Sequence, residues 1–144
     1  MRRFLFDTNV WVYALGDPHP YRDSCRRIVA DQGDGRLAGE VTSVVVAELV
    51  HQRLRQTGDR REAAQRGREL ALACRVHAPG EADASLALEL FERVAGLDSF
   101  DALLAATALN RGIDAILSAD RAFDHVDDLE RVDPLDSATG DRLG

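Results

Sequence analysis

The feature that most limits the possible folds is a regular alternation of short β-like runs with longer helical patterns. Hydrophobic periodicity and turn residues predict helices in six segments: residues 9–15, 21–31, 44–55, 60–73, 82–95 and 99–110. Strands are predicted between them, at residues 3–6, 37–41, 74–77, 115–117 and 130–132. This order predicts an α/β domain with a central, mainly parallel sheet of about four to five strands and helices on both faces.

The chain of 144 residues, 45% of them hydrophobic, suits a single domain over residues 1–144, with about the last ten residues frayed. Its apolar stretches fall short of the roughly 20 residues that cross a bilayer. The opening MRRFLFDTN has too short an apolar run for a signal peptide. We therefore expect a cytoplasmic protein without a membrane partner, whose Cys25 and Cys74 are reduced thiols.

All 18 basic residues are arginine, and the absence of lysine excludes several phosphate-handling enzymes. A haloacid-dehalogenase-like phosphatase and a receiver domain both need a lysine, and the phosphatase also needs an acid where this chain has Asn9. A P-loop enzyme needs a lysine and a glycine-rich loop. The net charge of −7 argues against nucleic-acid binding, but residues 51–75 carry a net charge of +4. That stretch is either a solvated helical face or a phosphate-binding surface.

Four acidic residues stand where a parallel α/β sheet would bring them together. Asp7 follows the first predicted strand, and Asp120 follows the strand at 115–117 after two small residues. Asp101 begins the most apolar helix, and Glu48 lies within a helix beside Ala47 and Leu49. Ligands of such sheets bind beyond the carboxyl ends of the strands. The four acids are therefore candidates for one site.

Each acid also has a purely structural explanation, and these explanations stay open at this point. Asp7 could cap the helix near Asn9, and Asp120 could cap a turn that ends at Phe123. Asp98 could be an N-cap with Asp101 in the capping-box position. A cap does not explain Glu48 in mid-helix, but an ion pair with Arg53 or Arg55 would.

The combination of the four acids favours metal chemistry. Carboxylates that lie close together repel one another and raise each other's pKa values. A divalent cation removes that cost, and oxygen-rich clusters suit Mg²⁺ or Mn²⁺. Such sites hydrolyse phosphodiesters.

Four segments, in this order, resemble the PIN-domain family and within it the VapC-like toxins of bacterial toxin–antitoxin pairs. They are FLFDTNVWVYAL with Asp7 and Asn9, TSVVVAELVH with Ser43 and Glu48, FDALLAATAL with Asp101, and LSADRAF with Asp120 and Phe123. They span almost the whole chain. The last segment has Ser118-Ala119-Asp120 where the family more often has Thr-Asn-Asp.

The resemblance implies a PIN-like three-layer domain and a metal-dependent endoribonuclease. Asp7 and Asp101 would be the principal ligands of Mg²⁺, or of Mn²⁺ in its place, and would activate a water for attack on RNA. Glu48 and Asp120 would complete the catalytic set, directly or through water, while Asn9 and Ser43 would support it. Asn9 could instead be an ordinary first-turn residue, and Asp98 and Asp124 are spare acids.

The resemblance also implies a small VapB-like antitoxin, often with an arginine in the acidic pocket, and a homodimer. The apolar, arginine-flanked helices within residues 43–73 are where we expect the antitoxin groove, although their apolar face could simply pack on the sheet. Two other functions stay open: a PIN nuclease of RNA processing without an antitoxin, and an inactive PIN-like binding module.

Overall fold

The central element of the computed structural model, which describes residues 1–136 and 138–144, is a five-stranded sheet. The strand order is β3-β2-β1-β4-β5, and every neighbouring pair is parallel. The strands are β1 Arg3–Phe6, β2 Ala38–Thr42, β3 Arg75–His77, β4 Ala115–Leu117 and β5 Glu130–Val132. The predicted α/β class and parallel sheet are confirmed.

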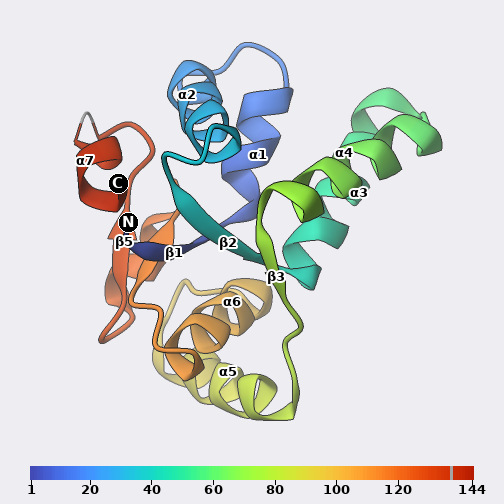
Figure 1. The fold of residues 1–144 in the computed structure, drawn as a ribbon. Coiled ribbons are helices and arrows are strands. Elements are labelled where there is room, and N and C mark those ends of the chain that lie inside the picture. Colours follow the sequence, from blue (N-terminus) through green and yellow to red (C-terminus); the bar gives the residue numbers. More distant parts are fainter. Residues whose placement is uncertain (137) are drawn as a thin grey trace.

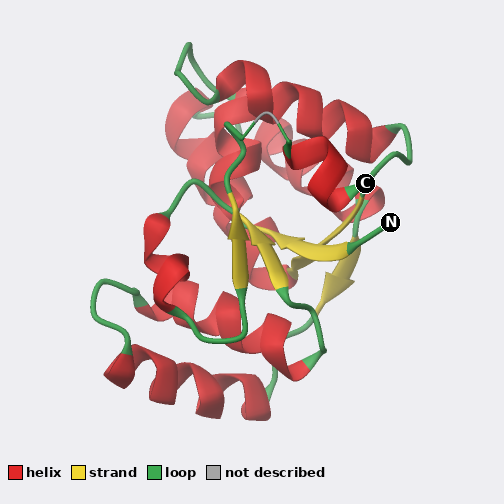
Figure 2. Cartoon of the chain, turned by 90° about the vertical axis from the view of Figure 1, so that its left-hand side faces the viewer, coloured by secondary structure: helices red, strands yellow, loops and turns green. Residues whose placement is uncertain are grey.

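Helices cover both faces of the sheet and make three layers (Figures 1 and 2). One layer holds α5 and α6, and α1 and α2 lie on the opposite side, with the hairpin of α3 and α4 extending beyond the β3 edge (Figure 1). The helices are α1 Thr8–Leu15, α2 Arg22–Gly33, α3 Ser43–Thr57, α4 Arg60–Ala73, α5 Glu81–Arg93, α6 Ser99–Asn110 and α7 Thr139–Leu143, with a 3₁₀ turn η1 at Arg121–His125. No helix in the described residues is long and apolar enough to span a bilayer.

The centre of the core is β1, because its three apolar residues Phe4, Leu5 and Phe6 are fully buried. The rings of Phe4 and Phe6 lie edge to face at 5.0 Å, and Phe6 meets Trp11 of α1 at 5.5 Å. This edge-to-face geometry is favourable beyond the burial of area. The stack fixes α1 on the sheet and so positions the chain that leaves β1.

Near the amino end of β2, a buried glutamine side chain takes the place of a neighbouring strand as hydrogen-bond partner of the backbone. Gln32 of α2 donates to the carbonyl of Gly39 at 3.1 Å and accepts from the Gly39 amide at 2.8 Å. It also donates to the carbonyl of Ala73 at 2.9 Å. Buried backbone groups need such partners. Gln32 therefore satisfies the stretch of β2 that lies before β3 begins.

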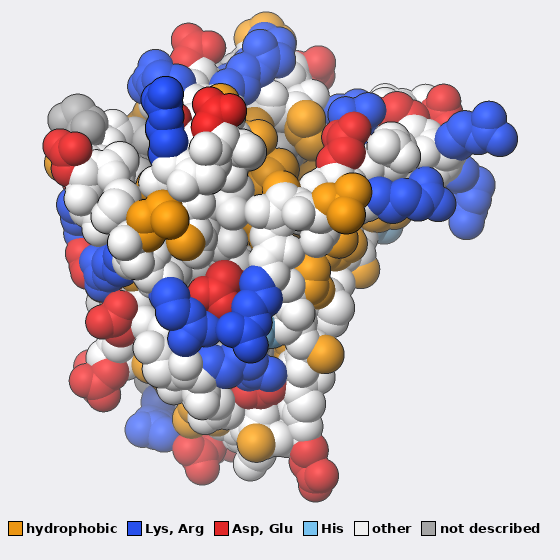
Figure 3. Space-filling model, viewed as in Figure 1, with side chains coloured by type: hydrophobic (Ala, Val, Ile, Leu, Met, Phe, Trp, Pro, Cys, Tyr) orange, Lys and Arg blue, Asp and Glu red, His pale blue; other side chains and the backbone are white. Residues whose placement is uncertain are grey.

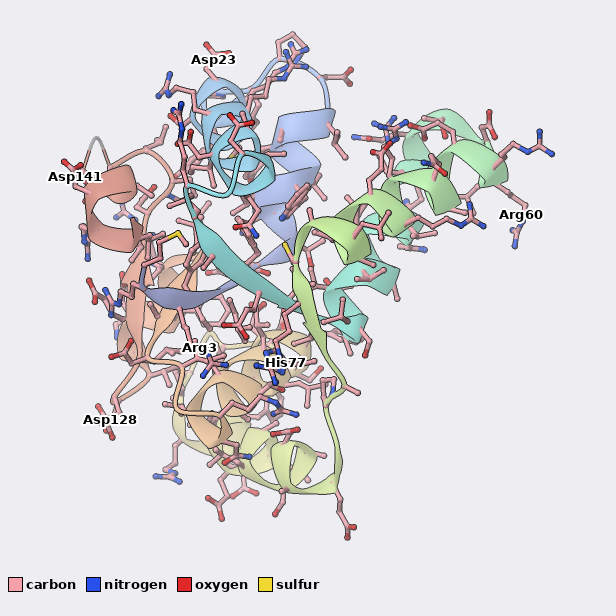
Figure 4. The ribbon with its side chains drawn as sticks, viewed as in Figure 1. Arg3, Asp23, Arg60, His77, Asp128 and Asp141 are labelled. Carbon is pink, nitrogen blue, oxygen red and sulfur yellow. The ribbon has the colours of Figure 1, made fainter. Side chains whose placement is uncertain are left out.

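The α3–α4 hairpin carries most of the arginine-rich stretch (Figure 3). Gly58 ends α3 with a left-handed φ of 67°, a conformation that favours glycine. Arg53 pairs with Glu62 at 2.6 Å, and Arg66 lies 3.1 Å from the same carboxylate. Arg60 extends into solvent at the far tip (Figure 4). Part of the basic charge is thus neutralised within the hairpin, and part is exposed.

The two helices of the layer below the sheet differ in how far they are buried. Helix α6 buries most of its length, as predicted from ALLAATAL. In α5, Ala87 and Leu90 are buried, but Phe91 is 51% exposed. The spacing of Ala87, Leu90, Phe91 and Val94 in the sequence predicts one core stripe, and for Phe91 this prediction is wrong. The buried line of α5 instead passes through Asp83, Ala87 and Leu90, which rotates Phe91 toward solvent.

The expected fraying of the last ten residues is also wrong for those that the structure describes; Ser137 lies outside them. Leu143 of α7 is fully buried, and its carbonyl accepts from the Arg2 amide at 3.3 Å. Arg142 pairs with Glu130 of β5 and with Asp136. The two termini thus lie together at the β5 side (Figure 1). Cys25 and Cys74 are free and buried, as expected.

Candidate active site

Asp7 is placed by the end of β1 and by the start of α1. Its backbone amide continues the β-ladder to the carbonyl of Leu117 at 3.0 Å, and its side chain is 8% exposed. One carboxylate oxygen accepts from the Thr8 amide at 2.7 Å, so Asp7 also caps α1. The prediction that Asp7 caps this helix is therefore confirmed, and the same carboxylate also lines the hollow described below. Burial raises the pKa of Asp7 most, and the charges of Asp120 and Asp98 raise it further, against the hydrogen bonds from Ser118 and Thr8.

A buried polar network ties Asp7 to the end of β4. The Ser118 hydroxyl donates to Oδ2 of Asp7 at 2.6 Å, and the Asn9 amide group donates to the same oxygen at 3.2 Å. Asn9 also donates to Oγ of Ser118 at 3.2 Å. The Asp120 amide donates to Oγ of Ser118 at 2.9 Å. Ser118 is fully buried and therefore fixes both strand-end acids.

Asp101 and Asp120 complete the acidic cluster from two further elements. Asp120 caps η1 through the Ala122 amide at 2.9 Å. Asp101 lies in the first turn of α6, where its amide donates to the Asp98 N-cap at 2.8 Å. Burial raises the pKa of Asp101 to about 8, together with the charges of Asp7 and Asp98 and the proximity of Asp120. The sheet and α6 thus hold three carboxylates close enough to disfavour one another's charge.

Glu48 reaches the cluster from the middle of α3. Its carboxylate accepts from the Thr8 hydroxyl at 3.2 Å. Burial raises the pKa of Glu48 most, and the charges of Asp7 and Asp98 raise it further. The alternative ion pair with Arg53 is wrong, because Arg53 pairs with Glu62 and donates to the carbonyl of Leu15.

The remaining predicted residues are divided between the site and its surroundings. Ser43 is exposed, and the polar group that caps α3 and lines the site is its neighbour Thr42, which accepts from the Val45 amide at 3.2 Å. Asp98 lies at the rim of the cluster as the cap of α6. Asp124 is paired with Arg131 at 2.8 Å and is not a spare acid of the site.

The acids open into a narrow hollow between α3 and α6, beyond the carboxyl end of the sheet. Asp7, Glu48 and Asp101 form its acidic part, with Thr42 beside them. Its other lining residues are Val44, Val45, Pro79, Phe100, Leu103 and Leu104. The lining contains no histidine, cysteine or arginine. The hollow therefore combines oxygen ligands with an apolar wall.

The donor set fits a hard divalent cation by its chemistry. Within residues 1–136 and 138–144, no three His, Cys, Asp or Glu side chains are grouped so that they could hold a metal ion without rearrangement. Both oxygens of Asp7 are engaged by Thr8, Ser118 and Asn9. The converging carboxylates nevertheless raise one another's pKa values, and a cation with an oxygen-ligand preference relieves that repulsion. Asp7, Glu48, Asp101 and Asp120 are the side chains that could hold it.

Two polar features of the site region were not anticipated from the sequence. Ser118 was noticed only as a departure from a family motif, although a small polar residue directly after a buried strand is the signal that marks it. The second feature is His77, which has no partner spacing in the sequence and lies 2.8 Å from the buried Glu40; Arg3 also binds Glu40, at 2.8 Å (Figure 4). The bond from Arg3 lowers the pKa of Glu40, with burial opposing it and His77 assisting.

Comparison with known proteins identifies the family of this fold and site. The PIN domain model matches residues 4–129. Ribonuclease VapC7 of Mycobacterium tuberculosis is 43% identical over 144 residues, which cover 96% of this chain and 99% of that protein.

Solved structures share the fold. VapBC2 from Rickettsia felis, bound to a DNA fragment from its promoter, superposes with a TM-score of 0.68 at 15% identity, covering 91% of this chain and 98% of that chain. A toxin–antitoxin complex from Klebsiella pneumoniae superposes with a TM-score of 0.67 at 14% identity, covering 91% and 97%. The strand-end acids, the parallel sheet and these likenesses agree: the chain belongs to the PIN-domain family and is a relative of the VapC ribonucleases.

Proposed function

We propose that this protein is a metal-dependent endoribonuclease and the toxin of a VapBC-type pair. The observation that supports this most is the convergence of Asp7, Glu48, Asp101 and Asp120, from four separate elements, at one edge of the sheet. The 43% identity to a ribonuclease supports RNA as the substrate. We expect the protein to act on RNA in the cytoplasm.

Asp7 and Asp101 would hold Mg²⁺, with Mn²⁺ as a substitute, and Glu48 and Asp120 would bind it directly or through water. A divalent ion held there would supply positive charge that stabilises a phosphodiester under attack by water. Asp7 is the most constrained of the four acids, because Ser118, Asn9 and the Thr8 amide fix its orientation. Thr8 also fixes Glu48 through its hydroxyl.

The side chains of the hollow favour attack on the phosphodiester by water over attack by a protein side chain. The lining has no cysteine or histidine, and the Thr42 hydroxyl is engaged in capping α3. The Ser118 hydroxyl is buried and donates to Asp7. No hydroxyl, thiol or imidazole described at the site is thus free to act as a nucleophile, so water is the expected nucleophile. The likeness to the PIN-domain family supports a product that carries a 5′-phosphate. A 2′,3′-cyclic phosphate, or cleavage that persists in EDTA, would contradict this mechanism.

The proposed protein partners are a VapB-like antitoxin and a second copy of the chain. Likeness to a toxin–antitoxin complex supports the first partner. A hollow between α3 and α4, lined by Val50, Leu54, Arg60, Ala63 and Ala64, is where an apolar antitoxin segment would bind. The exposed arginines of the hairpin would then meet acidic residues of the antitoxin (Figure 3).

The first experiment is cleavage of total cellular RNA by the purified chain, freed of antitoxin, in Mg²⁺ or Mn²⁺ and in EDTA. We expect discrete fragments that require the metal and that disappear in Asp7→Asn. Asp124→Asn is the matched control, because Asp124 pairs with Arg131 outside the hollow. It should cleave as the wild type does. Absence of cleavage by the wild type would instead favour an inactive binding module.

A further inference from the structure

The hollow has an apolar wall that the proposed metal chemistry does not use. Six of its lining residues are apolar, and they face the same space as Asp7, Glu48 and Asp101. Most of them are buried or half-buried, as expected for residues at a helix–sheet boundary. Phe100 differs, because 61% of it is exposed. An aromatic side chain thus stands at the mouth of the acidic site, directly before Asp101.

The exposure of Phe100 is not a consequence of a poorly packed helix. Ala102, Leu104 and Ala105, which follow it in α6, are at most 5% exposed. Phe100 therefore projects from the rim of an otherwise buried helix into the hollow and solvent. Exposed single apolar residues are common, so position within the site is what gives this one significance.

Within the hollow, affinity for RNA cannot come from ion pairs between arginine and the phosphates. The protein has a net charge of −7, and the hollow has no arginine in its lining. Phosphate contacts from basic residues, the usual source of affinity for nucleic acids, are therefore absent from that lining. An aromatic ring offers the other common source, because every base has a π-face that stacks on it.

We propose that Phe100 forms a nucleobase subsite, in which its ring stacks on an unpaired base adjacent to the scissile phosphate. The proposal rests on the ribonuclease function proposed above. It narrows the substrate to single-stranded or looped RNA, because a base within a duplex is stacked on both faces. It also gives the subsite little sequence preference, since stacking tolerates any base.

The ligand for the test is a fluorescent 12-nucleotide RNA of randomised sequence with hydrolysis-resistant phosphorothioate linkages. Its affinity for the full chain, freed of antitoxin, is measured by anisotropy in Mg²⁺. Base stacking contributes about 1–3 kcal/mol, so Phe100→Ala should weaken binding by about 5- to 150-fold. Phe100→Trp should retain wild-type affinity. Phe100→Leu, which keeps the apolar volume but not the π-face, should bind about as weakly as Phe100→Ala.

Two controls separate stacking from general damage. Phe91→Ala removes another aromatic residue, 51% exposed on α5 and outside the hollow, and should bind RNA as the wild type does. An otherwise identical abasic 12-mer should bind the wild type and Phe100→Ala equally. Each variant should keep the wild-type rise in melting temperature with Mg²⁺, which checks that Asp101 is undisturbed.

Wild-type affinity in Phe100→Leu, or an equal loss in Phe91→Ala, would overturn the subsite. So would a loss of antitoxin binding in Phe100→Ala with unchanged RNA binding, because the ring would then belong to a protein interface. Failure of the ribonuclease proposal is a separate result: the wild type would cleave no RNA in any divalent metal, whatever Phe100 binds. Metal-dependent cleavage with wild-type binding in Phe100→Ala would overturn the subsite alone.

Discussion

The hydroxyl of Ser118 donates a 2.6 Å hydrogen bond to Oδ2 of Asp7, and this contact joins the ends of β1 and β4. The same oxygen of Ser118 accepts from the Asp120 amide at 2.9 Å. One buried hydroxyl therefore sets the relative positions of two acids that are 113 residues apart in the sequence. Groups that orient metal ligands in this way contribute to activity without touching the substrate.

Replacing Ser118 by alanine should reduce metal-dependent RNA cleavage by about 10- to 100-fold, because Asp7 loses a donor and the Asp120 amide loses its acceptor. The Mg²⁺ concentration for half-maximal activity should rise at the same time. Ser118→Thr is the matched variant, since it keeps the hydroxyl and should retain most activity. Titration of Mg²⁺ against the cleavage rate measures both effects. Wild-type behaviour of Ser118→Ala would show that the contact does not position the acids.

Removing one charge from the acidic cluster should stabilise the metal-free protein. Asp101 is disfavoured as a carboxylate by burial and by the charges of Asp7 and Asp98. Asp101→Asn should therefore raise the free energy of unfolding in EDTA by about 1–3 kcal/mol. The same change should reduce the rise in melting temperature that Mg²⁺ causes, because a ligand is lost. Thermal unfolding with and without Mg²⁺ measures both.

Asp124→Asn is the control for that experiment, because its carboxylate is paired with Arg131 and lies outside the cluster. It should lower the free energy of unfolding, because the mostly buried Arg131 loses a charged partner, and it should keep the full metal effect. A stabilised Asp124→Asn, or an unchanged metal effect in Asp101→Asn, would mean that the acids do not share a cation site.

The acids of the site could be predicted because local signals in the sequence fix their positions. A buried β-run followed at once by Asp7 determines both the strand and the edge where the acid lies. A helix cap and a place in the acidic cluster do not exclude each other. Asp7 and Asp120 each satisfy a backbone amide and still belong to the cluster. Each residue therefore has both roles that its place in the sequence predicts, as a cap and as a member of the cluster.

The features that could not be predicted depend on contacts between distant elements. The exposure of Phe91 follows from how α5 is rotated on α6, which hydrophobic periodicity does not determine to within one residue. The C-terminal helix is ordered by Arg142 pairing with Glu130 of β5 and by burial of Leu143. A short polar segment gives no sign of such partners. Ser43 was expected in the site, but the helix turns its side chain outward and leaves Thr42 there.

Asp83 should make the free energy of unfolding fall at acid pH, below about pH 4. Burial raises its pKa, but hydrogen bonds from Arg111, the Gly80 amide and Asn110 outweigh burial and hold the pKa at about 2. An acid whose folded pKa is below its unfolded value of 3.8 stabilises the protein above that value. Its contribution, about 2 kcal/mol, is lost as the pH falls from about 4 toward 2.

Asp83→Asn should therefore unfold more easily than the wild type at pH 7, and the difference should narrow below pH 4. Urea unfolding at several pH values measures this. Glu89→Gln is the control, because Glu89 forms an exposed ion pair with Arg93 on the same helix. This substitution should change the free energy of unfolding little at any pH. If the difference in stability between the wild type and Asp83→Asn stayed constant across that pH range, the lowered pKa of Asp83 would be refuted.

The sharpest test of the fold itself is Gly39→Ala. A Cβ at this position would lie 2.2 Å from the Phe6 ring and 2.7 Å from the Phe4 ring. Both rings belong to β1 and pack in the core, so they cannot move without disturbing Trp11. Gly39→Ala should therefore lower the free energy of unfolding by about 2–3 kcal/mol or more.

Gly33→Ala is the matched substitution, because nothing lies within 4 Å of a Cβ at the end of α2. It should be neutral or stabilise the protein by up to about 1 kcal/mol. Equal stability of the two variants, measured by urea unfolding, would mean that β1 and β2 do not pack as described and that the position of Asp7 at the end of β1 needs another explanation.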